Sequence, residues 1–212
     1  MYIKPFIFNF KNSDQKIDFP GFDVPNKNIA ILTGDNGSGK TTFLNFIRSH
    51  SDYIDLKNIP VKCLMLEQLY DYLIYPYKPI WWNISLPKII KEKISKHEAI
   101  EIAQFQLKKF GLKLELNKSP ETLSGGEKHL LLISRFSLSD HNILLLDEPT
   151  TAIDKTRENI FWEIMIQINK EDNKKIILST HGDVLLNNIN NKYCIFQGFH
   201  NKNLKIQNYE AI

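Results

Sequence analysis

The sequence predicts an α/β fold in which a mainly parallel core sheet is flanked by helices. Two short apolar runs, at residues 29–32 and 143–146, and a third, mainly apolar run at residues 175–180 have the length and composition of buried strands. A stretch with apolar residues at helical spacing follows the first run closely, at residues 41–47. Open α/β sheets bind ligands beyond the carboxyl ends of their strands, so functional residues are expected directly after each apolar run.

The N-terminal segment, residues 1–33, is predicted to form short strands with turns at residues 12–14 and 20–21. Phe6, Phe8 and Phe10 alternate along it. Because side chains alternate between the two faces of a strand, these three rings are expected on one face, where they can pack in the core.

A glycine-rich loop follows the apolar run at residues 29–32 and fits the phosphate-binding pattern G-x-x-x-x-G-K-[ST]. Its glycines allow successive N–H groups to point at a phosphate, and the N-terminus of the predicted helix at residues 41–49 attracts the same anion. Lys40 adds a charge for the β- and γ-phosphates, and the Thr41 hydroxyl suits Mg²⁺. The residues expected to hold the nucleotide are Gly34, Asp35, Asn36, Gly37, Ser38, Gly39, Lys40, Thr41 and Thr42.

The next predicted strand, at residues 61–67, leads to Gln68 and then to a segment of different composition. Residues 70–82 are rich in tyrosine, tryptophan and proline and are predicted to be a loop, and a helix is predicted at residues 98–107. Aromatic residues are favoured at protein interfaces, so Trp81 and Trp82 suit the docking of a partner. The alternative is that they pack in the local core.

Residues 123–127 read Leu-Ser-Gly-Gly-Glu and precede an apolar helical stretch at residues 130–133. Ser124 offers a hydroxyl, and Gly125 and Gly126 offer bare N–H groups at the predicted helix N-terminus. This arrangement suits a γ-phosphate. The alternative is an ordinary capped helix.

Two carboxylates follow the apolar run at residues 143–146. Asp147 suits a contact with Mg²⁺ through water, and Glu148 suits a base that polarises an attacking water. Pro149 ends the strand because it cannot donate a ladder hydrogen bond. The third apolar run leads to His181, which suits a contact with the γ-phosphate. For the two carboxylates, the alternative is a solvated acidic turn. For His181, the alternative is a structural hydrogen bond only.

Taken in order, these segments resemble the ATPase domains of the ATP-binding cassette (ABC) family, most of all the stand-alone nucleotide-binding subunit of an ABC transporter. Gln68 resembles the family's glutamine that senses Mg²⁺ and water. Residues 123–127 resemble its signature, with Glu127 where glutamine is commoner. Residues 151–154 resemble its dimer-contacting loop, in which Asp154 is the key residue, and His181 resembles its switch histidine.

The resemblance implies a P-loop NTPase fold of ABC type, with an N-terminal antiparallel β-subdomain and an inserted helical lobe. A single domain would span residues 1–212. The core and β-subdomain would occupy residues 1–68 and 136–212, and the lobe with the signature would occupy about residues 69–135.

The resemblance also implies a mechanism with ATP and Mg²⁺ as cofactors. Two copies, expected to form a homodimer, would face each other head to tail, so that the signature of one copy completes the ATP site of the other. Asp154 would contact the second copy, and Phe10, favoured among the N-terminal aromatic residues, would stack on adenine. The expected catalytic residues are Lys40, Gln68, Glu148 and His181; the Mg²⁺ contacts are Thr41, Gln68 and Asp147; the signature residues acting on the partner's ATP are Leu123, Ser124, Gly125, Gly126 and Glu127.

The composition bears on partners and location. The formal net charge is +3 with no long basic block, so no nucleic-acid partner is expected. No run approaches the roughly 18 apolar residues of a membrane span, and the first residues do not resemble a signal peptide, so a cytoplasmic location is expected. Cys63 and Cys194 lie in apolar stretches and are expected to be buried, reduced thiols.

Two functions are compatible with these observations. The first is the ATP-hydrolysing subunit of a membrane transporter, peripheral on the inner face of the cell membrane, with a separate transmembrane subunit docked on the aromatic lobe. The short insertion between Lys40 and Ser124 favours it. The second is a soluble, non-transport ATPase of the same family with a regulatory, repair or defence role. A kinase or another P-loop enzyme is disfavoured by the signature and His181.

Overall fold

The computed structural model describes residues 1–9, 16–25, 29–57, 59–67, 71–150, 153, 155–180, 194–200 and 203–205. The chain divides into two compact units. The first, here called the sheet unit, comprises Met1–Glu67, His141–Pro149 and Asn169–Ile212. The second, here called the helical unit, comprises Gln68–Asp140 and Thr150–Ile168.

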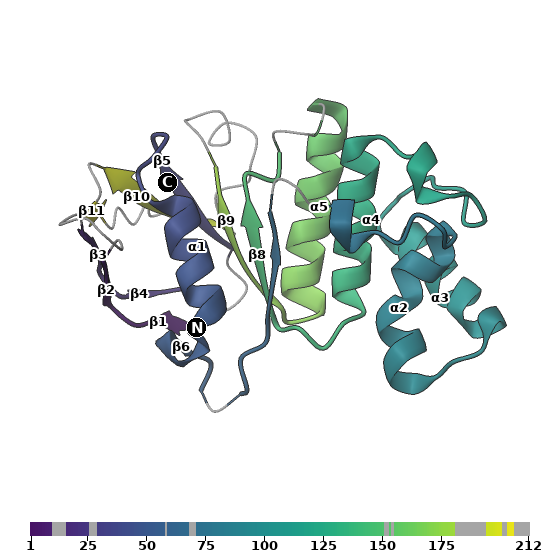
Figure 1. Ribbon diagram of the computed structural model, residues 1–212, viewed down its shortest axis with the longest axis horizontal. Helices are drawn as coiled ribbons and strands as arrows, with labels where there is room; N and C mark the ends of the chain where they lie inside the picture. The colour runs from purple at the N-terminus through teal and green to yellow at the C-terminus, as the bar shows by residue number, and fades with distance from the viewer. Residues whose placement is uncertain are drawn as a thin grey trace. The chain divides into compact units, whose positions relative to one another are not determined.

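The sheet unit is built on a sheet that has eight strands among the described residues (Figure 1). In spatial order the strands are β2 (Phe6–Asn9), β3 (Lys16–Phe19), β11 (Asn203–Lys205), β10 (Cys194–His200), β5 (Ile29–Gly34), β9 (Lys175–Ser179), β8 (Ile143–Asp147) and β7 (Cys63–Leu66). From β10 to β7, each strand is parallel to the next, whereas β10 is antiparallel to β11. Every residue of β8 and β9 is buried, as expected for parallel strands covered on both faces. The predicted parallel core sheet is confirmed.

Antiparallel strands gather at the N-terminal end of the chain. A second sheet consists of β4 (Phe22–Asp23), β1 (Tyr2–Ile3) and β6 (Ile54–Asp55), with β1 antiparallel to both neighbours. A short 3₁₀ helix, η1 (Ser51–Tyr53), precedes β6. In the large sheet, β2 and β3 form an antiparallel pair. These strands confirm the expected N-terminal antiparallel part of the fold.

Helix α1 (Lys40–Ser49) follows β5 and packs on the sheet. Its apolar residues Phe43, Leu44 and Ile47 have no exposed surface and join the core formed by strands of both sheets. Phe6 packs in the same core, with its ring 3.8 Å from that of Phe46 and nearly parallel to it, so the core assignment of Phe6 is confirmed. Cys63 is half-buried rather than fully buried, and burial raises the pKa of its thiol to about 11.

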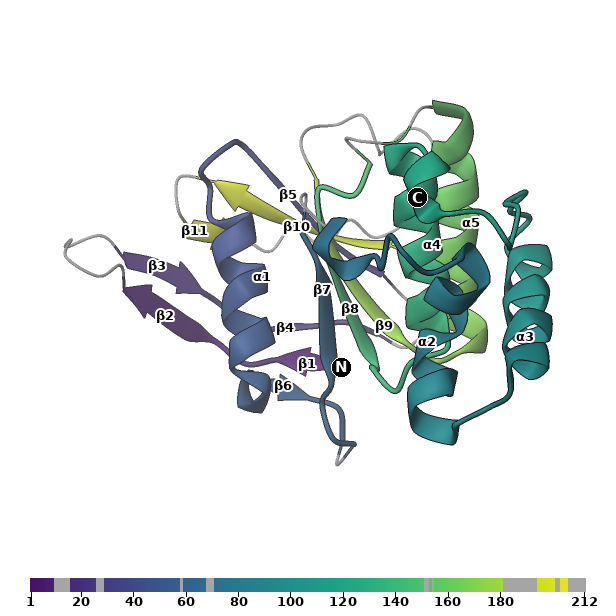
Figure 2. The same ribbon diagram turned by 45° about the vertical axis from the view of Figure 1, so that its right-hand side comes forward.

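The helical unit contains the helices η2 (Asp71–Leu73), α2 (Ile80–Glu92), α3 (Lys96–Lys109), η3 (Pro120–Thr122), α4 (Gly125–Ser137) and α5 (Lys155–Glu171), of which α5 belongs to it up to Ile168 (Figures 1 and 2). Helix α3 confirms the helix predicted at residues 98–107. The loop predicted up to Trp82 is wrong at its end, because α2 already begins at Ile80. Pro79 caps that helix in an extended conformation, and a proline so close to a helix start does not interrupt the helix.

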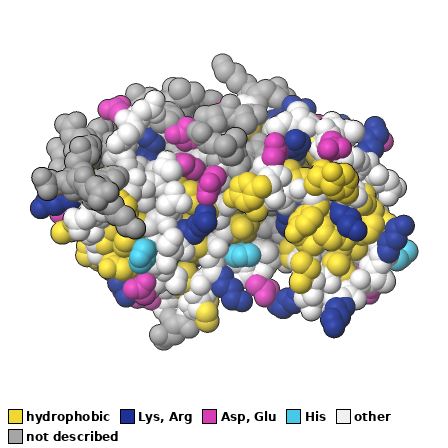
Figure 3. All heavy atoms as spheres, in the orientation of Figure 1, with side chains coloured by type: hydrophobic (Ala, Val, Ile, Leu, Met, Phe, Trp, Pro, Cys, Tyr) yellow, Lys and Arg dark blue, Asp and Glu magenta, His cyan; other side chains and the backbone are white. Residues whose placement is uncertain are grey.

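The segment before and into α2 carries exposed aromatic side chains. Tyr72, Tyr75 and Tyr77 are 67%, 49% and 96% exposed, whereas Trp81 and Trp82 are only partly exposed. Trp82 packs edge-on against Tyr75, with the ring centres 5.0 Å apart. Hydrophobic side chains gather over this part of the helical unit in the space-filling view (Figure 3). The tryptophans therefore pack partly within the unit, and the tyrosines provide most of the exposed aromatic surface.

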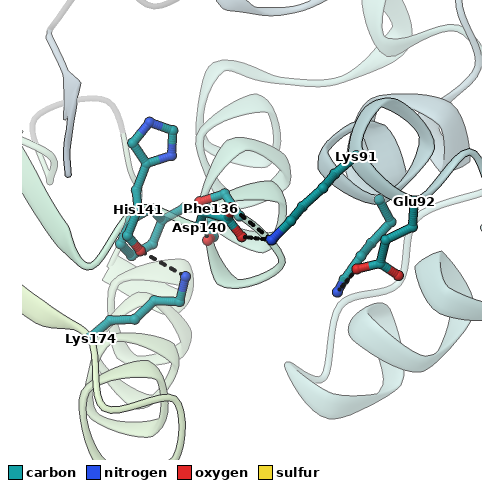
Figure 4. Close-up of polar contacts among 8 residues, drawn as sticks. Lys91, Glu92, Phe136, Asp140, His141 and Lys174 are labelled. Atoms are coloured by element: carbon teal, nitrogen blue, oxygen red, sulfur yellow. Dashed lines mark hydrogen bonds and ion pairs between the residues drawn. The ribbon is translucent and has the colours of Figure 1, made fainter. Parts of the chain in front are cut away.

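Two polar contacts fasten α4 to α2 within the helical unit. Lys91 of α2 donates to both carboxylate oxygens of Asp140, just after α4, at 2.8 Å each (Figure 4). Arg135 of α4 donates from Nε to the backbone oxygen of Asn83 at 2.6 Å. Pro87 lies inside α2 and has no N–H, so the Asn83 carbonyl lacks its usual helical donor. Arg135 supplies the hydrogen bond that Pro87 cannot make.

Candidate nucleotide-binding site

The predicted phosphate loop lies between β5 and α1, as the pattern requires. Gly37 and Gly39 have φ angles of 73° and 110°, which favour glycine. A Cβ atom at Gly39 would also lie 2.8 Å from the Cδ1 atom of Ile17, so a side chain here would force Ile17 to shift. The glycines therefore allow the sharp turn that directs the chain into α1.

Lys40 begins α1 and is buried. Its Nζ donates to the backbone oxygens of Gly34 at 2.6 Å and Asp35 at 2.9 Å. Burial lowers the pKa of Lys40, while the nearby carboxylates of Glu148, Asp147 and Asp35 act in the opposite direction. The loop thus places a cation beside the carboxylates at the end of β8.

The sheet order brings the loop strand and the acidic strand close together. Strand β9 lies between β5 and β8, with Ser179 aligned with Leu32 on one side and with Asp147 on the other. Asp147 is 8% exposed and accepts two hydrogen bonds. Thr41 Oγ1 donates to its Oδ2 at 2.8 Å, and Ser179 Oγ donates to its Oδ1 at 2.5 Å. The structure therefore brings the predicted residues Thr41 and Asp147 together.

Glu148 adopts an unusual backbone conformation, with a φ angle of 51°. Such left-handed conformations are uncommon for residues other than glycine and are enriched at functional sites. The Glu148 N–H donates to the backbone oxygen of Ser179 at 3.2 Å and to its hydroxyl at 3.1 Å. The chain thus leaves the sheet at Glu148 in a turn that hydrogen bonds to Ser179 of β9 hold in place.

The signature residues lie at the start of α4 in the helical unit. Ser124 is exposed and caps the helix, because its hydroxyl accepts from the Glu127 N–H at 3.3 Å and the Glu127 carboxylate accepts from the Ser124 N–H at 2.9 Å. Arg157 of α5 lies 3.3 Å from the other carboxylate oxygen of Glu127. This reciprocal cap gives Glu127 a physical role at the position where glutamine is commoner. The cap pattern, serine followed three residues later by glutamate, is readable from the sequence.

Several predicted site residues lie outside the described residues, namely Phe10, Gln68, Thr151, Ala152, Asp154 and His181. Their predicted roles stay predictions. Among the described residues, sequence reasoning missed Ser179, which contacts both Asp147 and Glu148. Its sequence signal is a serine at the end of a mainly apolar strand.

The sequence is similar to those of known proteins. A family model described as ABC transporter matches residues 19–151. The lipoprotein-releasing system ATP-binding protein LolD of Buchnera aphidicola is 30% identical over 207 residues, which cover 90% of this chain and 87% of LolD. The L-cystine import ATP-binding protein TcyN of Bacillus subtilis is 28% identical over 168 residues, which cover 71% of this chain and 65% of TcyN.

Solved structures show the same fold. CbiO1 of Clostridium perfringens, part of the ABC transporter complex CbiONQ, has a TM-score of 0.78 at 18% identity, with 98% of this chain and 87% of CbiO1 covered. A bacterial ABC transporter cassette solved as a dimer has a TM-score of 0.70 at 20% identity, with both chains covered completely.

Proposed function

Since this chain belongs to the ABC transporter family and is an ATP-binding ATPase, we propose that it powers a membrane transporter by pairing head to tail with a second copy around ATP. The observation that carries the proposal is the pair of half-sites on the two units. The sheet unit holds the phosphate loop with Thr41, Asp147 and Glu148. The helical unit holds an exposed Ser124 at the N-terminus of a 13-residue helix, where anions are attracted.

Within the first half-site, each residue has a proposed role. Lys40 and the loop N–H groups bind the β- and γ-phosphates, and Glu148 polarises the attacking water. Outside the described residues, Gln68 and His181 complete the catalytic set, Asp154 contacts the second copy, and Phe10 stacks on adenine. The whole chain, residues 1–212, acts as one cassette.

The oxygen atoms of Thr41 and Asp147 fit Mg²⁺. A hydroxyl and a carboxylate oxygen lie 2.8 Å apart, and Mg²⁺ prefers such hard oxygen ligands. No group of three or more His, Cys, Asp or Glu side chains gathers as a metal site in the described part of the chain. That agrees with Mg²⁺, which commonly uses one or two protein ligands together with phosphate oxygens. When bound, the ion neutralises phosphate charge; Thr41 and Asp147 would hold it, together with Gln68.

The exposed tyrosines of residues 72–77 form the proposed docking surface for a separate transmembrane subunit (Figure 3). Tyrosine supplies apolar contact area with a polar end and is common in the centres of interfaces. Among the described residues, no helix combines the length and the apolar character that a membrane span needs. The proposed location follows from this docking and is peripheral, on the inner face of the membrane, through the partner.

Co-purification from native membranes tests this function. The chain is extracted in mild detergent, and its companions are identified by mass spectrometry. We expect a transmembrane protein to accompany the wild type, and we expect it to be lost with Tyr77→Asp. Phe105→Asp is the control, because Phe105 of α3 is also an exposed aromatic residue, at 65%. Recovery of the wild type from the soluble fraction alone would instead support a non-transport ATPase.

A further inference from the structure

Ser179 is a completely buried hydroxyl in a strand whose other described residues are mainly apolar. A hydroxyl has one proton to donate and two lone pairs that can accept. The Ser179 hydroxyl donates a hydrogen bond to Asp147 Oδ1 at 2.5 Å and accepts one from the N–H of Glu148 at 3.1 Å. One side chain thus contacts both carboxylate residues of the proposed ATPase site.

The sheet topology explains this position. Ser179 is the last residue of β9, the strand between the phosphate-loop strand β5 and the acidic strand β8. It is aligned with Asp147, the last residue of β8. Aligned residues on adjacent strands place their side chains on the same face of the sheet, so a serine here reaches the neighbouring carboxylate directly.

The contact with Asp147 fixes the orientation of the carboxylate. Thr41 donates to one carboxylate oxygen and Ser179 donates to the other. Hydrogen bonds to an ionised oxygen are stronger than those between neutral groups, so both oxygens are restrained. If Thr41 moves toward a metal ion, the bond from Ser179 still holds Asp147 in place.

The contact with Glu148 supports a strained conformation. A φ angle of 51° costs free energy for a residue with a Cβ atom, and it persists only when surrounding contacts hold it. The Glu148 N–H has two acceptors, the hydroxyl and the backbone oxygen of Ser179. Removal of the hydroxyl would remove the shorter of these two contacts and leave the backbone contact at 3.2 Å.

We propose that Ser179 is a positioning residue that orients two residues at once. It holds Asp147 for its contact with Mg²⁺ and Glu148 for its contact with the attacking water. The inference rests on the proposed ATPase site. Ser179 lies in a strand outside the recognised motifs, and the proposal gives it a role in the Mg²⁺ dependence of the site.

The test compares Ser179→Ala with Ser134→Ala in the full-length protein. Ser134 is the matched control, because it is also completely buried and its hydroxyl makes a 2.9 Å hydrogen bond to the Leu130 backbone oxygen in the helical unit. For Ser179→Ala we expect kcat to fall about tenfold and the Mg²⁺ concentration for half-maximal activity to rise about tenfold, as is typical when a supporting contact to a metal ligand is lost. Ser134→Ala should change neither value.

ATP binding gives a second readout, independent of turnover. Isothermal titration calorimetry with ATP in Mg²⁺ and in EDTA should show weaker binding for Ser179→Ala in Mg²⁺ only. Ser179→Thr retains the hydroxyl in a strand and should restore the Mg²⁺ dependence. If Ser179→Ala matches Ser134→Ala in both readouts, Ser179 is only a core residue. If the wild type itself lacks Mg²⁺-dependent ATPase activity, the proposed function fails instead.

Discussion

The two units each contain a charged side chain held by hydrogen bonds, Asp147 buried in the sheet unit and Arg135 half-buried in the helical unit, and the two networks differ in kind. In the sheet unit, the Asp147 carboxylate accepts from two hydroxyl groups, and Lys40 donates to two backbone oxygens of the loop. In the helical unit, Arg135 donates to the backbone oxygens of Asn83 and Leu73 and to the Asn83 side chain, at 2.6–2.8 Å.

The two networks differ in whether their groups can bind a ligand in place of their present hydrogen-bond partners. Carboxylate, ammonium and hydroxyl groups at a strand end can rearrange around phosphate and a metal ion, because both ligands carry charges that these groups bind. The Arg135 contacts instead satisfy backbone oxygens within one unit. Burial lowers the pKa of Arg135 to about 10, so the guanidinium is still protonated at neutral pH. We interpret the first network as serving a ligand and the second as serving the fold.

The largest effect expected from this comparison concerns Glu148→Gln. The amide retains the size of the side chain and the backbone turn but cannot act as a base, so turnover should fall by about 10²–10⁴. ATP affinity and the free energy of unfolding should remain close to those of the wild type. Steady-state ATPase assays and calorimetry measure these quantities, and Glu121→Gln, on the surface of the helical unit, is the control. Wild-type turnover in Glu148→Gln would remove Glu148 from the role of base.

A smaller effect, on stability rather than on chemistry, is expected for Arg135→Met. The variant leaves the partly buried backbone oxygens of Asn83 and Leu73 without the Arg135 donor, and we expect a loss of about 3 kcal/mol in the free energy of unfolding. The surface variant Arg48→Met is the control. Arg48 pairs with Glu67 while both side chains are over 40% exposed, so its loss should cost less than about 1 kcal/mol.

Pro87→Ala sharpens this prediction. Alanine supplies the helical N–H that the Asn83 carbonyl lacks, so it should recover about 1 kcal/mol of the stability lost in Arg135→Met. The free energies of unfolding in urea of the wild type, both single variants and the double variant form a double-mutant cycle that measures this coupling. If the two substitutions prove additive, Arg135 does not compensate for Pro87.

Much of this arrangement could be predicted from the sequence. The apolar runs within β5, β8 and β9 are buried, and such strands are readable because apolar residues predominate on both of their faces. The phosphate loop is readable because Gly37 and Gly39 adopt conformations that few other residues adopt. Thr41 and Asp147 could be assigned to one site because both follow strands of one sheet.

The rest depends on contacts between segments far apart in the sequence. Ser179 acquires its role only from the strand order β5–β9–β8 and from its alignment with Asp147. Pro87 argues locally against a helix, yet α2 contains it because Arg135, 52 positions from Asn83, takes the place of the missing donor. Local patterns carry no information about such distant compensation.

The most direct test of the central claim, that two copies share ATP, is sedimentation velocity of Glu148→Gln with and without Mg²⁺ and ATP. The account predicts a monomer of 24.8 kDa without nucleotide and a dimer with ATP. Ser124→Arg in the same background should abolish the dimer while ATP still binds.

Ser95→Arg is the matched control, because Ser95 caps α3 with the same reciprocal contacts to Glu98 that Ser124 makes with Glu127. It should lose the cap and retain the dimer. A species that stays monomeric in ATP, or a dimer unaffected by Ser124→Arg, would contradict the account.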